Sequence, residues 1–330
     1  MQTPAADPTI GDDIDGEDLV IRRAAVDALG MQNGSVVVAD PLTGRILTMV
    51  NQKLALAGGF TPCSTIKLVT ALAALSEHVI DKNASIHLSR YISFNLTTAL
   101  AHSNNQYFAN LGTRLGFDRM IHYASMLGMG EKAGLDIPGE QPGGLATEPP
   151  KAGGMGMLTA FGEGFHMTPL ELTAILSVIA NGGTLYYLQW PHTTDEVEHL
   201  TPQVKRTLDL EPSTIDDIKV GMRGAVDYGT ARRASDSGET ILGKTGTCTD
   251  FQARSHMGWF GSFNEDGARK LVVVVMLTSP VKSVSGPLAS GVAGAFYRNL
   301  SAQNYFTLAS NGGAKSDLPE IVSTVPCCSK

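Results

Sequence analysis

Residues 62–67 read Pro-Cys-Ser-Thr-Ile-Lys and lead into an apolar run, Leu68 to Leu75, that contains neither Gly nor Pro. Apolar residues at helical spacing predict a buried helix here, with Ser64 at its N-terminus. Residues three apart share a helix face, so the amine of Lys67 can reach the hydroxyl of Ser64. The helix dipole also favours an anion at this end. The stretch therefore predicts a serine nucleophile beside its own base.

The Ser-x-x-Lys spacing is weak by itself, because a chain of this length is expected to contain it about once by chance. A second match is Ser279-Pro-Val-Lys282. It follows an apolar run and precedes Ser-Val-Ser-Gly-Pro, which is poor helix-forming material. The surrounding sequence therefore favours Ser64 over Ser279.

Composition indicates a globular protein with a substantial core, since 43% of the 330 residues are hydrophobic. A net charge of −7 and a pI near 5.6 argue against a nucleic-acid partner, and no basic run suggests an anionic membrane surface. No apolar stretch reaches roughly 18 residues, and residues 1–16 are acidic where a signal peptide would be basic. An extracytoplasmic function would therefore require an anchor or leader that this chain does not show.

The four cysteines do not predict a metal site. No pair has zinc-ligand spacing with a nearby His, so we expect neither a metal nor a cofactor. Cys327 and Cys328 are adjacent in a polar tail, where we expect loose rather than structural thiols. The other two are Cys63 and Cys248.

The chain divides into a disordered acidic leader (residues 1–17), one domain (18–305) and a C-terminal tail (306–330). The Gly- and Pro-rich residues 138–156 are expected to form an ordered loop. Strands are expected at residues 35–40, 45–50, 240–247, 257–263 and 271–277. Helices are expected at residues 19–29, 65–75, 97–102, 105–115, 118–127, 169–180, 215–226 and 291–300.

This order of elements predicts an α/β fold of the α+β kind. Two strands come from the beginning of the chain and three from its end, so one five-stranded antiparallel sheet is the simplest arrangement. N- and C-terminal helices flank the sheet, and the intervening helices form an inserted all-helical lobe.

Three short motifs follow one another along the chain: Ser64-x-x-Lys67, Ser103-Asn104-Asn105 and Lys244-Thr245-Gly246-Thr247. This combination is similar to that of penicillin-binding proteins and class A β-lactamases, whose middle motif is Ser-x-Asn or Ser-Asp-Asn. The pattern also fits Ser93-Phe94-Asn95. Residues 99–112 resemble the corresponding stretch of penicillin-binding transpeptidase domains, where the motif opens a helix near an aromatic residue, and they favour Ser103.

The resemblance to penicillin-binding transpeptidase domains covers about residues 20–300 and implies the β-lactamase/transpeptidase fold. One departure is Glu163, where the family usually shows Gln between two glycines. Further matching stretches are residues 36–47, 135–140, 162–169 and 179–183.

The resemblance implies an acyl-serine mechanism on a D-alanyl-D-alanine peptide or a β-lactam. Ser64 would attack the carbonyl, Lys67 would accept its proton, and Ser103 would relay a proton to the leaving amine. To act as a base, Lys67 must be neutral for part of the time, and desolvation beside the cationic Lys244 lowers its pKa.

The resemblance also assigns the remaining motif residues. The backbone amides of Ser64 and Thr247 would form the oxyanion hole. The side chains of Lys244, Thr245 and Thr247 would hold the substrate carboxylate. Asn105 and Lys244 are assigned to the catalytic set, and the substrate-binding set is Asn104, Thr245, Gly246 and Thr247.

Cys63 immediately precedes Ser64, and Cys248 immediately follows Thr247. This layout is similar to that of certain class A carbapenem-hydrolysing β-lactamases and implies a Cys63–Cys248 disulfide. If both flanking amides face one oxygen, the two Cα atoms fall within the roughly 4.4 to 6.8 Å that a disulfide needs. Two separate buried thiols are the alternative.

Three functions stay open. The first is a penicillin-binding D,D-transpeptidase or D,D-carboxypeptidase of peptidoglycan synthesis, which β-lactams acylate. The second is a serine β-lactamase, which needs a base for the deacylating water. Glu-x-x-Leu-Asn does not occur between Ser103 and Lys244, but that interval contains Glu140, Glu148, Glu163 and Glu171. The third is a non-catalytic β-lactam sensor or scaffold, against which the intact motifs argue.

The first function implies a peptidoglycan stem peptide, β-lactams and other cell-wall synthesis proteins as partners. It also implies an extracytoplasmic location and a membrane anchor in the full-length protein. Among the remaining candidates, we expect His102 to pack or hydrogen-bond rather than act as a base. Trp190 and Trp259 are expected to be core or groove aromatics, and Glu163 to be structural.

Overall fold

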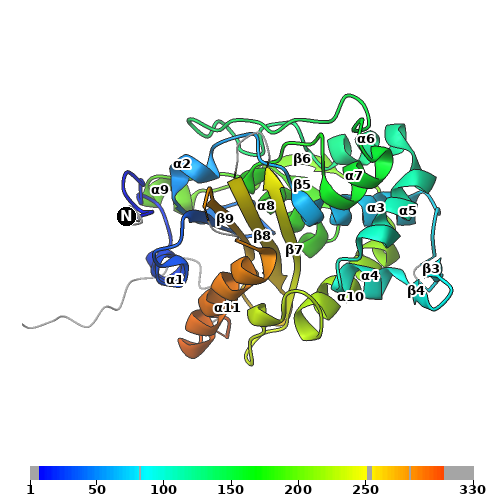
Figure 1. Cartoon of the computed structure of the whole chain (residues 1–330). Coiled ribbons are helices and arrows are strands. Elements are labelled where there is room, and N and C mark those ends of the chain that lie inside the picture. The colour runs from blue at the N-terminus through cyan, green and yellow to red at the C-terminus, as the bar shows by residue number, and fades with distance from the viewer. Residues whose placement is uncertain (1–6, 82, 251–254, 282–283, 308–330) are drawn as a thin grey trace, which may run out of the picture.

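The computed structural model describes residues 7–81, 83–250, 255–281 and 284–307. A five-stranded antiparallel sheet lies at its centre, with helices on both faces (Figure 1). The strands run in the order β2-β1-β9-β8-β7, so both ends of the chain contribute to one sheet, as the sequence predicted. Their bounds are β1 (Gly34–Ala39), β2 (Ile46–Val50), β7 (Ile241–Asp250), β8 (Ser255–Asn264) and β9 (Val272–Ser279).

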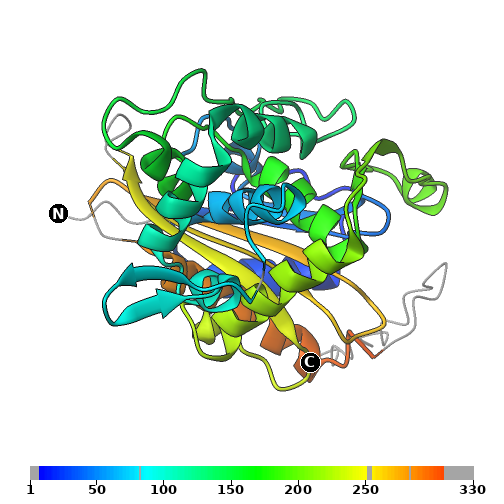
Figure 2. The same cartoon turned by 90° about the vertical axis from the view of Figure 1, so that its right-hand side faces the viewer.

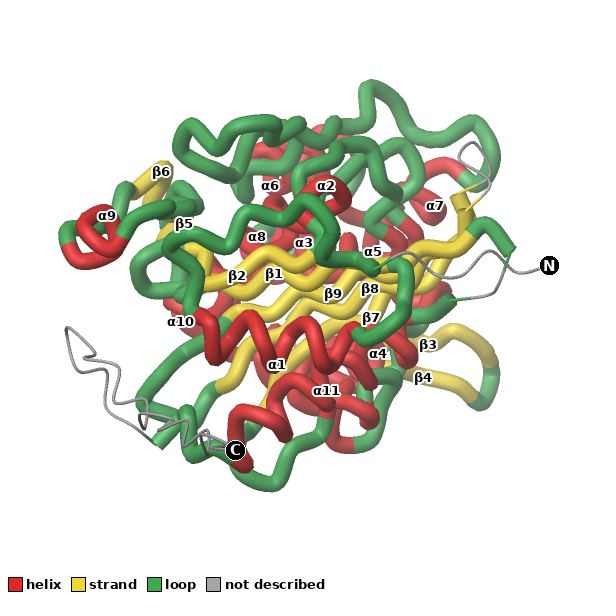
Figure 3. Tube along the Cα trace, turned by 90° about the vertical axis from the view of Figure 1, so that its left-hand side faces the viewer, coloured by secondary structure: helices red, strands yellow, loops and turns green. Residues whose placement is uncertain are grey.

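β9 is an uninterrupted apolar run because both of its faces are covered. Successive side chains of a strand point to opposite faces. Val273 and Val275 pack in the cluster formed with α1 (Leu19–Leu29) and α11 (Gly286–Ala302), which lie together across one face of the sheet (Figure 3). Val274 and its neighbours on the other face join the cluster that contains α8 (Pro169–Asn181).

The chain between β2 and β7 builds a helical lobe beside the sheet (Figure 1). Its central helix is α3 (Lys67–Ser76), of which every residue from Lys67 to Leu75 is buried, and this explains the apolar sequence. The helices that contact α3 are α5 (Asn105–Leu115), α6 (Phe117–Met126), α7 (Gly154–Phe161) and α10 (Pro212–Asp227). α4 (Leu96–Ala101) packs on α10, and the short α2 (Gln52–Ala55) lies against β1 and β2.

α7 begins inside the region that was expected to be a loop. Gly156 of α7 and Gly112 of α5 allow these two helices to pack closely. A Cβ on Gly156 would lie 3.1 Å from the Cβ of Ala109, and one on Gly112 would overlap Thr159. The expected loop is confirmed for residues 138–153, and only its last three residues, 154–156, belong to α7.

Two small hairpins, also not predicted, project from the lobe (Figure 2). Their strands are only three or four residues long and partly exposed, so they lack the apolar alternation on which strand prediction rests. They are β3 (Ile86–Ser89) with β4 (Ile92–Phe94), and β5 (Thr184–Tyr186) with β6 (Val204–Thr207), with α9 (Thr194–Glu198) between β5 and β6.

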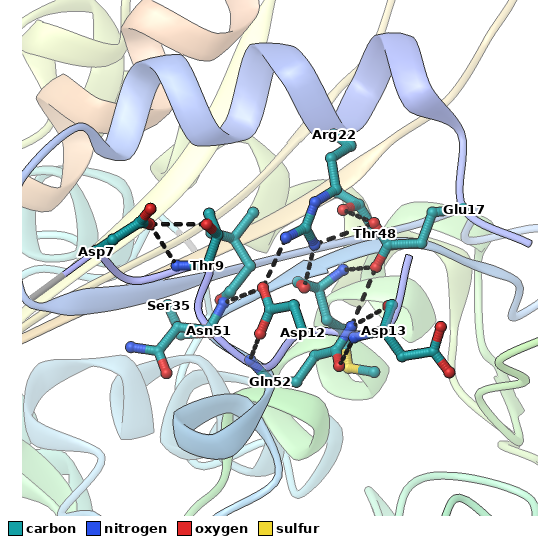
Figure 4. A network of polar contacts seen from close by, with 12 residues as sticks. Asp7, Thr9, Asp12, Asp13, Glu17, Arg22, Ser35, Thr48, Asn51 and Gln52 are labelled. Atoms are coloured by element: carbon teal, nitrogen blue, oxygen red, sulfur yellow. Dashed lines mark hydrogen bonds and ion pairs between the residues drawn. The ribbon is translucent and has the colours of Figure 1, made fainter. Parts of the chain in front are cut away.

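Residues 7–17 were expected to belong to a disordered leader, and the structure corrects this for the part that it describes. Asp12 forms an ion pair with Arg22 at 2.7 Å, and only 3% of its side chain is exposed (Figure 4). Its carboxylate also accepts hydrogen bonds from the backbone N–H groups of Asn51, at 2.9 Å, and Gln52, at 2.8 Å. The acidic residues thus satisfy backbone donors at the end of β2.

Glu17 joins the same network (Figure 4). Its fully buried side chain accepts from Thr48 Oγ1 at 2.6 Å and from the Met49 N–H at 2.9 Å, and it pairs with Arg22 at 3.1 Å. The acidic composition of residues 7–17 predicted a solvated segment. Composition could not show that Arg22, in the following helix, pairs with these carboxylates. The packed part of the chain therefore begins before residue 18.

The other boundary also shifts slightly. Phe306, which was placed in the tail, is buried against Tyr297 of α11, and its carbonyl accepts a hydrogen bond from Ala268 N–H at 2.9 Å. The remainder of the expected tail from residue 308 onward, with Cys327 and Cys328, lies outside the described residues.

Candidate active site

Ser64 lies in a tight turn that contacts both the sheet and the helical lobe. It belongs to η1 (Cys63–Ile66), a 3-10 helix that leads directly into α3, so Ser64 lies at the N-terminal end of the buried helix, as the sequence predicted. The turn begins at Cys63, whose φ of 52° lies in the left-handed region. In 3-10 geometry residues three apart are stacked, which brings Lys67 next to Ser64. Ser64 keeps 8% of its surface exposed.

The amine of Lys67 contacts four oxygen atoms from the first two motifs. Its Nζ lies 3.0 Å from Ser64 Oγ and 3.0 Å from Ser103 Oγ. It also lies 2.8 Å from the Ser103 carbonyl oxygen and 2.6 Å from Asn105 Oδ1. The structure thus brings together four residues that the sequence assigned to one site.

The environment of Lys67 favours the neutral amine. Burial, and to a smaller extent the positive charge of Lys244, lower the pKa of Lys67 from 10.5 to about 6. Both causes were expected from the sequence. At neutral pH the lone pair on Nζ is therefore available to accept a proton from the Ser64 hydroxyl.

The connection between α4 and α5 carries the second motif. Ser103 has a φ of 53°, a left-handed conformation that turns the chain sharply before α5. Asn104 was assigned to substrate binding, but its side chain caps α5 by accepting from the Tyr107 N–H at 2.8 Å. Ser103 and Asn105 flank this cap and are the two residues of the motif that contact Lys67.

The third motif lies on β7, next to the turn that holds Ser64. Lys244 is fully buried, burial lowers its pKa to about 7, and its Nζ donates to the Thr245 carbonyl at 3.0 Å. Thr245 Oγ1 lies 2.6 Å from Thr230 Oγ1. Thr247 is exposed, and its Oγ1 accepts from the Gly286 N–H at 2.8 Å. Sequence reasoning missed Thr230, for which Gly229-Thr230 after a helix was the only signal.

Gly246 allows β7 to approach the Ser64 turn. A Cβ at this position would lie 3.1 Å from the Pro62 carbonyl oxygen and 3.2 Å from Thr65 Cγ2. Any larger residue would push the strand away from the turn. Gly246 therefore sets the distance between two motifs rather than contacting a ligand through a side chain.

Cys63 and Cys248 sit on either side of this contact between turn and strand. Their sulfur atoms are within bonding distance, and their Cα atoms are 5.5 Å apart. This separation lies inside the range that a disulfide requires. The geometry fits the pairing that the sequence resemblance implied.

Two of the four candidate glutamates are occupied by structural contacts. Glu171 forms the capping box of α8 with Thr168 and accepts from the N–H groups of Gly130 and Gly143. Burial raises its pKa to about 7, although these hydrogen bonds oppose the shift. Glu140 is buried and accepts from backbone N–H groups at positions 133 and 134.

The other two glutamates differ in position. Glu148 is exposed in the loop before α7. Glu163 is partly exposed in the segment after α7, and its carboxylate forms no hydrogen bond or ion pair with any residue that the structure describes. The backbone N–H of Glu163 donates to the Met157 carbonyl at 3.3 Å, but no side-chain hydrogen bond or ion pair among the described residues supports the structural role that we expected for this glutamate.

Among the described residues, the remaining sequence candidates do not contact Lys67, although Trp259 pairs with Gly246 across β7 and β8. His102 is exposed and its ring contacts Phe94 and Tyr228. Trp259 is buried on β8 and donates to the Thr61 carbonyl at 3.1 Å. Trp190 lines a cavity of about 600 Å³ that none of the three motifs lines.

The two alternative serine motifs are also separate. Ser93 lies in the hairpin strand β4, which supports the choice of Ser103. Ser279 is the last residue of β9, and Lys282 lies outside the described residues. Neither serine contacts Lys67 in the described part of the chain.

In residues 7–81, 83–250, 255–281 and 284–307, no group of three or more His, Cys, Asp or Glu side chains is arranged to hold a metal ion. Within the same ranges, no helix combines the length and apolar character needed to cross a membrane.

The antiparallel sheet, its inserted helical lobe and the Ser64–Lys67 pair between them define the β-lactamase/transpeptidase class of folds. Within that class, the chain belongs to the penicillin-binding protein transpeptidase domain family, whose model matches residues 34–300.

The names of similar proteins are consistent with this family. Stage V sporulation protein D of Bacillus subtilis is 29% identical in an alignment of 282 residues that covers 76% of this chain and 44% of the relative. Peptidoglycan D,D-transpeptidase MrdA of Haemophilus influenzae is 24% identical in a gapped alignment of length 357 that covers 83% of this chain and 54% of the relative. The chain thus spans about half of the length of these relatives.

Solved structures share the fold. The transpeptidase domain of Burkholderia pseudomallei penicillin-binding protein 3 aligns with a TM-score of 0.73 and 18% identity, over 92% of this chain and 98% of that one. Pseudomonas aeruginosa PBP2 in complex with WCK 5153 aligns with a TM-score of 0.72 and 23% identity, over 89% and 76%. Both alignments extend across the sheet and the helical lobe together.

Proposed function

We propose that this chain is the D,D-transpeptidase domain of a penicillin-binding protein, and that it forms an acyl-enzyme on Ser64 from peptidoglycan stem peptides. The observation that carries the proposal is the 3.0 Å contact of Lys67 Nζ with Ser64 Oγ, in surroundings that lower the pKa of Lys67 to about 6. A neutral amine against a hydroxyl is what general-base activation of a serine needs. The name of the H. influenzae relative supports the same reaction.

In the acylation step, Ser64 Oγ attacks the carbonyl carbon of the D-alanyl-D-alanine bond and its proton passes to Lys67 Nζ. The bond to the terminal D-alanine breaks, and its nitrogen takes up a proton through Ser103 Oγ, which lies 3.0 Å from Lys67 Nζ. A β-lactam follows the same path, but its leaving nitrogen stays tethered to the acyl group. Asn105, at 2.6 Å from Nζ, orients the lysine.

The residues of β7 would bind the substrate. The N–H groups of Ser64 and Thr247 form the oxyanion hole, and one such donor is worth about 3 to 4 kcal/mol in other enzymes. Lys244 and Thr247 hold the substrate carboxylate, while Thr245 is positioned by its contact with Thr230. Burial of Lys244 strengthens its attraction for a carboxylate that displaces water.

A β-lactamase is the weaker reading of the same site. It needs a carboxylate that is free to activate water. Glu140 and Glu171 are committed to backbone N–H groups, so Glu163 is the candidate that keeps this alternative open.

The contacts of Lys67 with Ser64 and Ser103 likewise disfavour a non-catalytic sensor, because binding alone does not require a general base beside the serine. Hydrolysis of a chromogenic cephalosporin, followed together with the mass of any trapped adduct, separates the three functions.

The direct test is the site of penicillin attachment. We expect one equivalent of penicillin on Ser64, located by mass spectrometry of a tryptic digest. An adduct on Ser279, or no adduct under conditions that label a known transpeptidase, contradicts the proposal.

We further propose an extracytoplasmic location, with the full-length protein anchored to the membrane and working with other cell-wall synthesis proteins. Such a compartment permits disulfides, and the close approach of Cys63 and Cys248 supports a disulfide there.

A further inference from the structure

The segment after α7 runs beside the Ser64 turn. Ser64 Oγ lies 3.5 Å from the carbonyl oxygen of Ala160, in the last turn of the helix. Two residues later, a Cβ on Gly162 would lie 2.4 Å from Cγ of Pro62, so only glycine fits against the turn. Residues that follow directly are therefore close to the nucleophile.

Glu163 is the next residue along this segment. Gly162 ends α7 in a left-handed conformation, with a φ of 74°, so the chain leaves the helix axis at Glu163. The side chain is partly exposed, and its carboxylate has no hydrogen bond or ion pair within the described part of the chain. By contrast, Glu140 and Glu171 are buried and bound to backbone donors. Among the described residues, no positive group therefore pairs with the Glu163 carboxylate, and this residue directly follows the glycine that packs against the Ser64 turn.

That charge suits the second half of the reaction, if the chain is the transpeptidase proposed above. The acyl group on Ser64 can pass to water or to the amine of a second peptide. Near neutral pH a primary amine is mostly an ammonium ion, whereas water carries no charge. A fixed carboxylate at the site therefore raises the local concentration of the amine relative to that of water.

We propose that Glu163 determines acceptor specificity by attracting the ammonium form of the acceptor amine to the Ser64 acyl-enzyme. The ammonium then loses one proton to solvent, and the resulting amine attacks the ester carbonyl. A C–N bond forms, the C–O bond to Ser64 Oγ breaks, and the second amine proton returns to Oγ through Lys67. The products are the amide and the free enzyme, with no further reactant required.

The test compares wild type, Glu163→Gln and a matched control, Glu198→Gln, whose exposed side chain lies on α9. A thioester analogue of the donor peptide is supplied with glycinamide as a cationic acceptor, and the ratio of amide to hydrolysed product is measured by mass spectrometry. Glu163→Gln is expected to lower this ratio roughly two- to fivefold, the effect of one exposed ion pair, while Glu198→Gln leaves it unchanged.

The salt dependence of the amide-to-hydrolysis ratio is a second test. Raising ionic strength from about 0.05 to about 0.5 M should lower the wild-type ratio toward that of Glu163→Gln and leave the variant's ratio almost constant, because salt screens exposed charges. An unchanged ratio in the variant, or a salt response equal to that of wild type, overturns the proposal. So does a selective loss of hydrolysis, which would make Glu163 a base for water.

Penicillin labelling of wild-type Ser64, measured first, keeps the two proposals apart. If Ser64 is not labelled, the proposed function fails. If Ser64 is labelled and the amide ratio does not respond to Glu163, only the role of Glu163 fails.

Discussion

Lys67 Nζ lies 3.0 Å from Ser64 Oγ. Both residues are buried: 0% of the surface of Lys67 and 8% of the surface of Ser64 is exposed. An ammonium in this position would lack hydration and would face the positive charge of Lys244. The free amine avoids both costs, so burial itself prepares the base. The serine needs no histidine in this arrangement.

Replacing Lys67 by Met should slow acylation of Ser64 by about 10² to 10⁴, the usual range for loss of a general base. Methionine is a better control than alanine, because it fills most of the buried volume of the lysine. The second-order rate constant with a β-lactam measures the effect, and a thermal melt checks the fold. A variant that melts like wild type and acylates at the wild-type rate shows that another group takes the proton.

Acylation should follow a bell-shaped pH profile. Below about pH 6 Lys67 is protonated and cannot accept the serine proton, so the rate should rise as pH passes through its pKa. Above about pH 7 Lys244 loses the charge that holds the substrate carboxylate, so the rate should fall. The free-enzyme rate constant with a carboxylate-bearing β-lactam, measured from pH 5 to about 10, tests both limbs.

Two controls test which lysine causes each limb of the pH profile. Lys67→Met should lose the rising limb. At saturating β-lactam the bound carboxylate should raise the pKa of Lys244 and move the falling limb to higher pH. A rate that climbs steadily to about pH 10 contradicts the assignment, because that is the range of an ordinary lysine.

The sheet and most of the helices were predictable from the sequence because their apolar patterns are long. The expected helices at 19–29 and 105–115 match α1 and α5 to the residue. The run at 271–277 identified the central strand β9. Short exposed strands such as β3 and β4 could not be predicted, since three or four residues without alternation carry no periodic signal.

The candidate site was predictable for residues whose type alone suits the chemistry. Ser64, Lys67, Ser103, Asn105 and Lys244 follow from motifs, and the structure brings the first four into direct contact. Asn104 was assigned to substrate binding, and its side chain also caps α5, a role that the motif alone did not indicate. The contact between Thr230 and Thr245 depends on tertiary packing between a helix end and β7, which no local pattern encodes.

Asp12→Asn should destabilise the fold by about 1 to 3 kcal/mol, because it leaves the buried Arg22 with one carboxylate fewer and weakens two backbone hydrogen bonds. Asp15→Asn is the matched control, since Asp15 is exposed in the same segment. Urea unfolding of the two variants measures the difference. Equal stability of both would mean that residues 7–17 do not pack in solution as they do here.

Glu171→Ala should lower the free energy of unfolding by about 2 to 4 kcal/mol, because three backbone N–H groups, one buried and two partly buried, lose their acceptor. The exposed Glu148→Ala should change stability by less than about 0.5 kcal/mol. Urea unfolding again gives the values. A Glu171→Ala variant with wild-type stability but slower loss of the β-lactam adduct would identify Glu171 as a deacylation base instead of a cap.

The close approach of Cys63 and Cys248 predicts that reduction affects the chemistry more than binding. Their Cα atoms are 5.5 Å apart, and each neighbours one of the two proposed oxyanion donors, Ser64 and Thr247. A bond there closes a loop of 185 positions, for which chain entropy alone gives up to about 5 kcal/mol. Reduction should therefore lower the melting temperature and slow acylation, with little change in the affinity for intact substrate.

The Cys63→Ala/Cys248→Ala double variant is the control, and its acylation rate should not respond to the reductant. Alkylation of unfolded, unreduced protein, followed by peptide mapping, decides whether the bond exists: if both cysteines are alkylated, turn and strand are held together by packing around Gly246 alone.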